Sequence, residues 1–329
     1  MKSRGKQPVW EGSLHQAVHE TFVLGSFVAA ISAKVEKLPS AGESVRARSF
    51  LIEAGGKGLN IAVGLQRLGC DVNGVFGVGD DLFADIARAA FEKARLPASM
   101  LEPLGGPSGS GVGLIDETGE NIIAVFPGAN DLLAAQHIRK SAAAILRAQM
   151  VIAQFEISDE PILAAFRIAR EHAIRTILSP SPFRRISSEL LALTTVLIVN
   201  RSEAIALAVE LCVPIHQSDQ NDWRSFGGLA SALFAGGIST FVLTLGSAGA
   251  ALWTKGHPPI HAPAFAVLAI DSTGAGDAFL AGFSAGLARG YMLYDCLIQA
   301  NACGALMACN MGVLENMPTL DQVVELSSA

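Results

Sequence analysis

Asp271-Ser272-Thr273-Gly274-Ala275-Gly276-Asp277 lies between an apolar run at residues 264–270 and a helical pattern of Phe279, Phe283 and Leu287. Small residues at positions 274–276 let the backbone approach an anion closely. The N-terminus of the following helix offers unpaired N–H groups and the positive end of the helix dipole. The segment therefore predicts a turn that binds a phosphoryl group and leads into a helix.

Asp277 lies in the first turn of that predicted helix, where the helix dipole favours a carboxylate. From there it can accept a proton from an attacking hydroxyl while the N–H groups at 274–276 hold the phosphoryl group. The same residues also fit an ordinary strand-to-helix turn, in which Asp277 only complements the helix terminus. An isolated G-A-G-D sequence does not distinguish the two interpretations, so other segments must do so.

The pattern D-[ST]-x-G-A-G-D at residues 271–277 resembles the carboxy-terminal signature of the ribokinase-like carbohydrate kinase family, often called the PfkB family. The segment Ala54-Gly55-Gly56-Lys57-Gly58-Leu59-Asn60 resembles the family's amino-terminal signature, in which the glycines and the asparagine line the sugar pocket. Further family markers follow in order: Gln154-x-Glu156, Asn200-x-x-Glu203 and Thr244-Leu245-Gly246-Ser247-Ala248-Gly249. The resemblance extends from residue 22 to residue 317 and is closest to the ribokinases within the family.

The resemblance implies an ATP-dependent, Mg²⁺-requiring kinase with Asp277 as general base and Gly274, Ala275 and Gly276 as the anion hole. The residues implied to bind the sugar are Gly56, Lys57, Asn60, Glu156 and Asp277. The residues implied to bind ATP are Asn200, Thr244, Gly246, Ser247, Gly249, Gly276 and Asn301.

Two cation sites are also implied by the resemblance. Asn200 and Glu203 match the N-x-x-E pattern, in which the glutamate holds Mg²⁺ through water, but the same spacing fits a helix N-cap with a capping glutamate. The places of a K⁺ site beside the anion hole are taken by Asp271, Thr273, Gly312 and Asn316. Asp271 could equally be a structural carboxylate at the end of a strand.

Short apolar runs alternate with longer helical patterns, which predicts an α/β fold with a doubly wound, mostly parallel sheet flanked by helices. The apolar runs lie at residues 22–27, 150–155, 176–178, 195–199 and 241–245. The helical patterns lie at 132–146, 160–171 and 224–234. In such a fold the ligand binds at the carboxyl ends of the strands.

Two segments, at about 31–53 and 109–127, interrupt this alternation with a strand-like pattern. They predict a small β-sheet outside the main layer, because two separate surface hairpins would each lack a core. The resemblance implies that this sheet is a lid over the sugar and that its outer face forms a homodimer. We expect residues 1–21 to be an N-terminal tail, at least partly disordered, and residues 22–329 to form the kinase domain.

Composition argues against several classes of protein. The net charge is −6 and no Lys/Arg run tracks a phosphodiester backbone, which argues against nucleic acid as a partner. No apolar run reaches the roughly 18 to 20 residues that span a bilayer. Five cysteines without C-x-x-C spacing favour a reducing cytoplasm over a disulfide framework or a zinc site. Gly55-Gly56-Lys57-Gly58 lacks the spacing and the hydroxyl of a P-loop.

The acceptor side departs from the family pattern. Val28 and Ala30 stand where ribokinases have Asn and Asp, and that Asp binds sugar hydroxyls far from the phosphorylated one. Losing such a charged hydrogen bond, worth about 1.5–3 kcal/mol, would weaken ribose binding and favour a deoxy sugar or a nucleoside. The leading interpretation is a kinase for a hydroxymethyl group of a pentose. The alternatives are a nucleoside kinase, a phosphohexose kinase, which lacks an evident basic cluster here, and a non-catalytic sugar or nucleotide sensor.

Overall fold

The structure is a computed structural model that describes residues 19–118, 120–215 and 222–328. Its main sheet has nine strands in the order β13-β12-β11-β10-β9-β8-β1-β4-β5. The strands are β1 (Glu20–Gly25), β4 (Asp71–Val78), β5 (Leu101–Pro103), β8 (Met150–Gln154), β9 (Arg175–Ser179), β10 (Val196–Asn200), β11 (Thr240–Thr244), β12 (Ala250–Thr254) and β13 (Ile260–Ala262). Neighbouring strands from β5 to β11 are parallel, and β12 and β13 are antiparallel additions at one edge.

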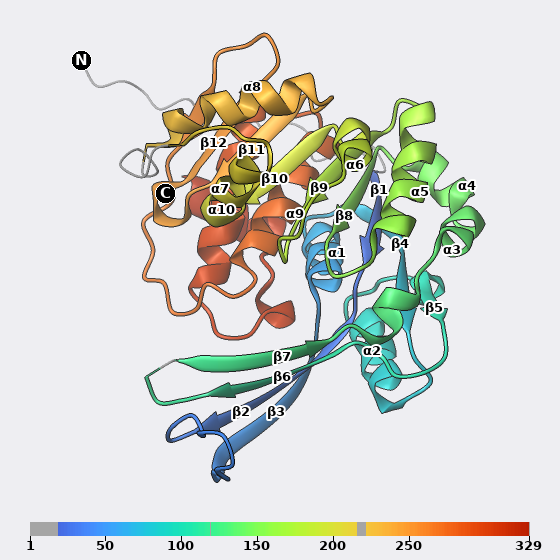
Figure 1. Ribbon diagram of the computed structural model, residues 1–329, viewed down its shortest axis with the longest axis vertical. Helices are drawn as coiled ribbons and strands as arrows, with labels where there is room; N and C mark the ends of the chain where they lie inside the picture. The colour runs from blue at the N-terminus through green and yellow to red at the C-terminus, as the bar shows by residue number, and fades with distance from the viewer. Residues whose placement is uncertain (1–18, 119, 216–221, 329) are drawn as a thin grey trace.

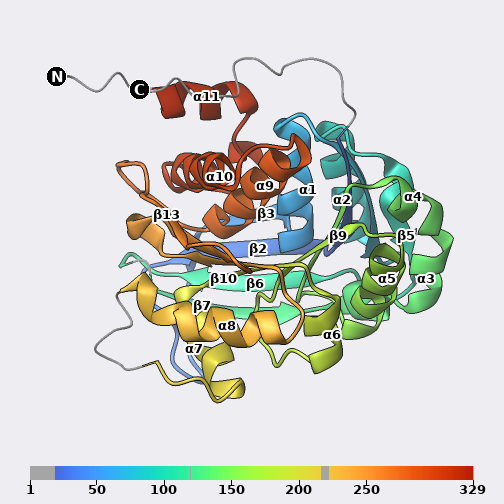
Figure 2. The ribbon, with the colours of Figure 1, turned by 90° about the horizontal axis from the view of Figure 1, so that it is seen from above.

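Helices cover both faces of this sheet, which confirms the doubly wound α/β fold (Figure 2). One face carries α1 (Lys57–Arg67), α2 (Leu82–Lys93), α9 (Ala275–Ala288), α10 (Leu293–Ala308) and α11 (Leu320–Ser328). The other carries α3 (Ala135–Lys140), α4 (Ala142–Arg147), α5 (Asp159–Glu171), α6 (Ser188–Leu193), α7 (Arg201–Glu210) and α8 (Gly227–Ala235). Each face has its own apolar core, because the side chains of the buried strands alternate between the two.

The five expected strands form at β1, β8, β9, β10 and β11, with bounds shifted by one or two residues. The helical pattern at 132–146 is divided instead into α3 and α4, which meet at Ser141. The pattern at 224–234 begins with a 3-10 turn, Trp223–Phe226, before α8. β1 starts at Glu20, inside the expected tail of residues 1–21, and residues 1–18 lie outside the described part.

The apolar run at residues 264–270 is not a strand, so the turn at 271–277 does not follow one. Its side chains are not buried: Leu268 is 85% exposed and Ile270 is 62% exposed. The backbone N–H groups of Ile270 and Asp271 donate to the carbonyl of Ala308 at the end of α10. β13 is the edge strand of the sheet, and residues 264–270 do not pair with it as a further strand. They lead instead to the hydrogen bonds with Ala308 at the end of α10.

A second, four-stranded sheet in the order β3-β2-β6-β7 projects from the body near α2 (Figure 1). Its strands are β2 (Val28–Val35), β3 (Ala47–Gly55), β6 (Ser110–Ile115) and β7 (Asn121–Phe126), and we call it the small sheet. β2 continues directly from β1, so the small sheet begins where the central strand of the main sheet ends. The expected sheet outside the main layer is therefore confirmed.

Among the described residues, no helix combines the length and the apolar character needed to cross a bilayer.

Candidate active site

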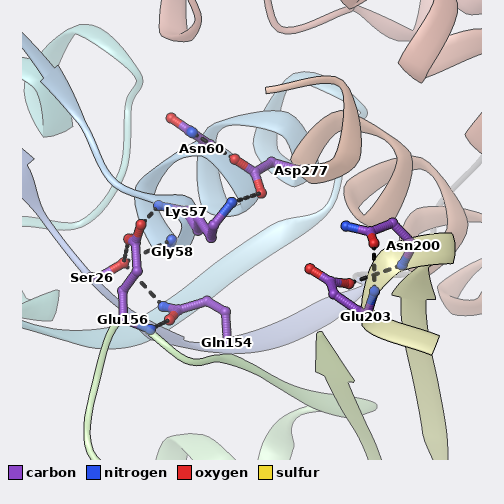
Figure 3. Close-up of polar contacts among 9 residues, drawn as sticks. All are labelled: Ser26, Lys57, Gly58, Asn60, Gln154, Glu156, Asn200, Glu203 and Asp277. Atoms are coloured by element: carbon purple, nitrogen blue, oxygen red, sulfur yellow. Dashed lines mark hydrogen bonds and ion pairs between the residues drawn. The ribbon is translucent and has the colours of Figure 1, made fainter. Parts of the chain in front are cut away.

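The candidate site lies at the carboxyl ends of β1, β8 and β10, where α1, α7 and α9 begin (Figure 3). The strand order changes direction at β1, since β4 lies on one side of it and β8 on the other. A crevice at the carboxyl ends of the strands is the usual ligand site of such sheets. The two glycine-rich segments of the sequence, at 54–60 and 271–277, meet here although more than 200 residues separate them.

Asp277 is held by two side chains of α1. Asn60 Nδ2 donates a hydrogen bond to Asp277 Oδ2 at 2.7 Å, and Lys57 Nζ lies 3.9 Å from Asp277 Oδ1 (Figure 3). The Asp277 side chain is 12% exposed, so it is largely removed from water but can still be reached. The fold thus fixes the direction of this carboxylate by one hydrogen bond and one cation.

Burial raises the pKa of the Asp277 carboxyl above its ordinary value. The positive charge of Lys57 and the hydrogen bond from Asn60 lower the pKa, and the charges of Glu156 and Glu203 raise it. A carboxylate with a raised pKa is a stronger base than an exposed aspartate. A carboxyl whose pKa is raised by burial is the kind of group expected at a functional site.

The turn before α9 consists of small residues, as expected of an anion cradle. Gly274 caps the helix with φ 77°, a left-handed conformation that favours glycine. A Cβ at Gly274 would also lie 2.6 Å from Val313 Cγ1, whereas a Cβ at Gly276 would meet nothing within 4 Å. The first N–H groups of α9 have no acceptor within the helix, although the N–H of Ala275 donates to the carbonyl of Ser272 at 3.1 Å. Backbone donors and the Asp277 carboxylate therefore share one helix end.

The N-terminus of α1 is pressed against the end of β1, which explains the glycines of G-G-K-G. Gly56 has φ 102°, and a Cβ there would lie 2.7 Å from the carbonyl oxygen of Ser26. A Cβ at Gly58 would lie 2.2 Å from the backbone nitrogen of Ser26. The close approach places Lys57 and Asn60 opposite Asp277.

Glu156 links three segments at this point. Its Oε2 accepts hydrogen bonds from Ser26 Oγ at 2.6 Å and from the backbone N–H of Lys57 at 2.8 Å. Gln154 Nε2 donates to Ser26 Oγ at 3.1 Å, and Gln154 Oε1 accepts from the backbone N–H of Glu156 at 2.8 Å. A carboxylate at a helix N-terminus is stabilised by the helix dipole. Glu156 therefore positions α1 whatever contact it makes with a sugar.

Sequence reasoning assigned no role to Ser26, Asn130 or Arg184, and each of them positions the site. Asn130 is buried and bonds both backbone groups of Phe27, at 3.1 and 2.8 Å. Arg184 donates to the carbonyls of Phe155 and Ile157, on either side of Glu156. Only Ser26 carried a signal, because it lies close to Val28 and Ala30 of β2, which depart from the family pattern.

Asn200 and Glu203 form a complete capping box at the start of α7. The N–H of Asn200 donates to Glu203 Oε2 at 2.9 Å, and the N–H of Glu203 donates to Asn200 Oδ1 at 2.9 Å. The helix N-cap with a capping glutamate, one of the two interpretations of this pair, is therefore confirmed. The pair lies on the β10 side of the site (Figure 3), and the Glu203 charge still acts on Asp277. Glu203 therefore caps α7 and also influences Asp277 through its charge.

The residues expected to bind the nucleotide lie beyond β10, around the end of β11. Thr244 ends β11, and the 3-10 turn Gly246–Ala248 follows it, with Ser247 at its centre. Gly249 has φ 88°, and a Cβ there would lie 2.1 Å from the carbonyl oxygen of Ala262. Asn301, on α10, donates to the carbonyls of Ala262 and Pro263, both at 3.0 Å. Asn301 thus fixes the chain after β13, next to the same loop.

The residues expected to hold K⁺ fall into two turns beside the anion cradle. Asp271 Oδ1 accepts from the N–H and the hydroxyl of Thr273, at 2.9 and 2.7 Å. Asn316 Nδ2 donates to the carbonyls of Met311 and Gly312, at 2.7 and 3.1 Å. The amide group of Asn316 therefore stabilises the later turn through its nitrogen. The two turns approach each other where Val313 packs against Gly274.

A cavity of about 590 Å³ opens beside Asn60, between the small sheet and the body. Its walls come from β2, β3, α1, α2 and the turn at residues 313–315, and most of them are apolar. Asn60, which lines this cavity, also donates to Asp277. The cavity is thus continuous with the residues expected to bind the acceptor.

Comparison with known proteins agrees with this geometry. The model of the "pfkB family carbohydrate kinase" matches residues 18–320. A ribokinase of Bacillus subtilis (strain 168) is 31% identical over 306 residues, which cover 93% of this chain and 98% of that protein. A deoxyribokinase of Salmonella typhi is 28% identical over 309 residues, with 93% and 98% covered. The structure of Arabidopsis thaliana ribokinase complexed with ribose and ATP superimposes with a TM-score of 0.85 at 25% identity, covering 95% of this chain and 100% of that one.

Proposed function

The chain belongs to the pfkB family of carbohydrate kinases, and we propose that it transfers the γ-phosphoryl group of ATP to a hydroxymethyl group of a pentose. The observation that carries this proposal is the buried Asp277 carboxylate, which is aimed by Asn60 and Lys57 at the mouth of a glycine-lined helix terminus. A base and an anion cradle on one rigid element are what in-line phosphoryl transfer requires.

In the proposed reaction, Asp277 takes the proton of the acceptor hydroxyl, whose oxygen attacks the γ-phosphorus as the bond to the ADP oxygen breaks. The N–H groups of Gly274 and Gly276 hold the transferring oxygens, whereas the N–H of Ala275, expected to share this role, donates to the carbonyl of Ser272. Lys57 offsets the negative charge that gathers near the base. We further propose that the small sheet closes over the acceptor as a lid, because closure excludes water that would otherwise be phosphorylated.

The proposed nucleotide site fits a magnesium-bound triphosphate. Glu203 is 8% exposed and, like Glu156, raises the pKa of Asp277, so a cation between these carboxylates would relieve their repulsion. Mg²⁺, when bound, would neutralise the developing charge on the phosphates. Asn200 and Glu203 would hold its waters, and Thr244, Gly246, Ser247, Gly249 and Asn301 would surround the nucleoside part of ATP.

We propose K⁺ as a further activator, held by Asp271, Thr273, Gly312 and Asn316. The support is the pair of adjoining turns that bring carboxylate, hydroxyl and carbonyl oxygens beside the anion cradle. Such oxygen groups are the ligands that hard cations prefer.

A nucleoside is the second candidate acceptor, and the cavity favours it. A volume of about 590 Å³ with mostly apolar walls exceeds the needs of a pentose and falls in the range of larger ligands. Ala30 adds no polar group to the wall nearest to Asn60. The relatives described above include both a ribokinase and a deoxyribokinase, so loss of one sugar hydroxyl is also compatible with the family.

The test is ATP-dependent ADP release with Mg²⁺, using D-ribose, 2-deoxy-D-ribose, fructose, fructose phosphates and common nucleosides as acceptors. We expect turnover of a pentose or a nucleoside, with faster turnover when K⁺ replaces tetramethylammonium. ATP binding without turnover of any acceptor would contradict the proposal and favour a sugar or nucleotide sensor.

The raised pKa of Asp277 predicts the acid side of the pH profile. Since the base must be ionised, kcat/KM should fall on acidification at a pH above the ordinary aspartate range. Lys57 lowers this pKa, so Lys57→Met should move the acid limb to higher pH. The measurement is the pH dependence of kcat/KM for the native enzyme and for Lys57→Met. If the acid limb of the variant lies at the same pH as that of the native enzyme, or at a lower pH, the assignment of Asp277 as base is contradicted.

We propose a homodimer through the outer face of the small sheet. Strand register brings Phe50, Ile52, Val112, Ile122 and Phe126 to one face, and each is at least 39% exposed. Such a large apolar patch marks an interface, and a second copy would bury it symmetrically. Sedimentation should give a dimer for the native chain and a monomer for Ile122→Glu. Val209→Glu changes an exposed apolar residue of α7 and should leave the dimer intact, whereas a native monomer would refute the proposal.

A further inference from the structure

The strand register of the small sheet places a carboxylate opposite Ala30. β2 and β3 are antiparallel, and Ala30 pairs directly with Glu53. Directly opposite residues project from the same face of a sheet, with their Cβ atoms about 4.5–5.5 Å apart. Both residues line the cavity beside Asn60, as Leu51 and Ile52 of β3 also do. By strand register, Ala30 and Glu53 project from the sheet face opposite to that of Phe50 and Ile52. Glu53 therefore brings a negative charge into a cavity wall that Ala30 leaves apolar.

Glu53 differs from the other charged residues of the cavity wall, which are engaged with the protein. Lys93 forms an ion pair with Glu315, and Arg67 donates to the carbonyl of Glu315 at 2.8 Å. Within the described ranges, no hydrogen bond or ion pair involves the Glu53 side chain. Glu53 is exposed at the cavity wall, so its carboxylate is accessible to a group that enters the cavity.

The Glu53 carboxylate reaches from the small sheet toward the body. Its Oε1 lies 3.8 Å from the position that a Cβ on Gly312 would occupy. The carboxylates whose charge acts on Asp277 are Glu156 and Glu203, and Glu53 is not among them.

We propose that Glu53 is a specificity-determining residue, whose carboxylate accepts a hydrogen bond from a hydroxyl or amino group at the end of the acceptor remote from the phosphorylated hydroxyl. This inference rests on the proposed kinase function and assigns a further residue to its acceptor site. Because Glu53 belongs to the small sheet and Asp277 to the body, one acceptor bound to both would hold the two parts together. Acceptor binding and lid closure would then be coupled.

The test compares Glu53→Ala and Glu53→Gln with the native enzyme, using the acceptor that gives the highest kcat/KM among D-ribose, 2-deoxy-D-ribose and common nucleosides. A lost hydrogen bond to a charged group should raise the acceptor KM about 10- to 100-fold. The kcat and the KM for ATP should stay within about threefold, as expected for a group that binds ground and transition states equally. Glu36→Ala removes an exposed carboxylate directly after β2, outside the cavity, and should change none of these values.

A relocation variant tests whether the carboxylate itself matters. Adding Ala30→Asp to Glu53→Ala returns a carboxylate to the same face of the strand pair, so the double variant should recover about tenfold of the lost acceptor affinity. An unchanged acceptor KM in Glu53→Ala, or a change confined to K⁺ activation, would overturn the inference while leaving the kinase function intact. Undiminished turnover in Asp277→Asn would instead refute the proposed function, and this inference with it.

Discussion

Asp277→Asn is expected to lower kcat by about 10²- to 10⁴-fold, because it removes the group proposed to take the proton of the acceptor hydroxyl. The substituted amide keeps the size of the side chain and can still contact Asn60, so the acceptor should bind with little change in KM. The loss would thus fall on the chemical step. Steady-state kinetics with the preferred acceptor, together with ATP titration, separate the two effects.

Stability provides an internal check on this variant. Because burial raises the pKa of Asp277, the folded protein binds this proton more tightly than the unfolded chain does. Ionised Asp277 therefore costs stability as the pH rises from the ordinary aspartate range through the raised pKa. Asp277→Asn removes that cost, so its unfolding midpoint at neutral pH should equal or exceed that of the native protein.

Asp295→Asn is the matched control, since Asp295 is the third residue of α10 as Asp277 is the third residue of α9. It should leave kcat unchanged because α10 does not begin at the site. A kcat for Asp277→Asn within tenfold of the native value would exclude Asp277 as the base.

The segments proposed to form the reacting end could be located in the sequence because each of them is short and contiguous. A small-residue turn before a helix specifies an anion cradle locally, and Asp277 belongs to that same helix. The contact between Asp277 and Asn60 crosses 217 residues, and it was anticipated only because both segments belong to recognised signatures.

The acceptor end could not be predicted in the same way, because it depends on strand register. Nothing in the sequence shows that Glu53 pairs with Ala30, since a shift of one residue would move Glu53 to the other face. Ser26 was missed for a related reason: its role arises from the packing of α1 and β8 against the end of β1. Tertiary contacts of single polar residues leave no periodic pattern in the sequence.

Hydrophobicity was also an incomplete guide to strands and caps. The run at residues 264–270 is apolar yet exposed, because the sheet has its edge at β13. The N-x-x-E spacing of Asn200 and Glu203 supported two interpretations, and the capping box forms while the magnesium role stays a proposal. A residue pair that serves helix capping is not thereby excluded from binding a cation with its remaining oxygens.

Gly58→Ala is expected to have the largest effect on folding, with a loss of about 3 kcal/mol in the free energy of unfolding. The added Cβ would lie 2.2 Å from the backbone nitrogen of Ser26 and 2.4 Å from Gly25 Cα. Both are main-chain atoms, one in the last residue of β1 and one in the residue that follows it, so no side-chain rotation can relieve the overlap. Helix α1 must move away from β1.

That movement would also reach the site, since α1 carries both Lys57 and Asn60. A displacement of about 1 Å can cost on the order of 10²-fold in rate, so kcat/KM should fall even for the folded fraction. Gly227→Ala is the control: its Cβ would approach only Trp253 Nε1, at 4.0 Å, and it should keep or slightly raise stability. Chemical denaturation followed by fluorescence measures both variants. Equal unfolding midpoints for the two would mean that α1 is not pressed against β1, and the positions proposed for Lys57 and Asn60 would lose their physical basis.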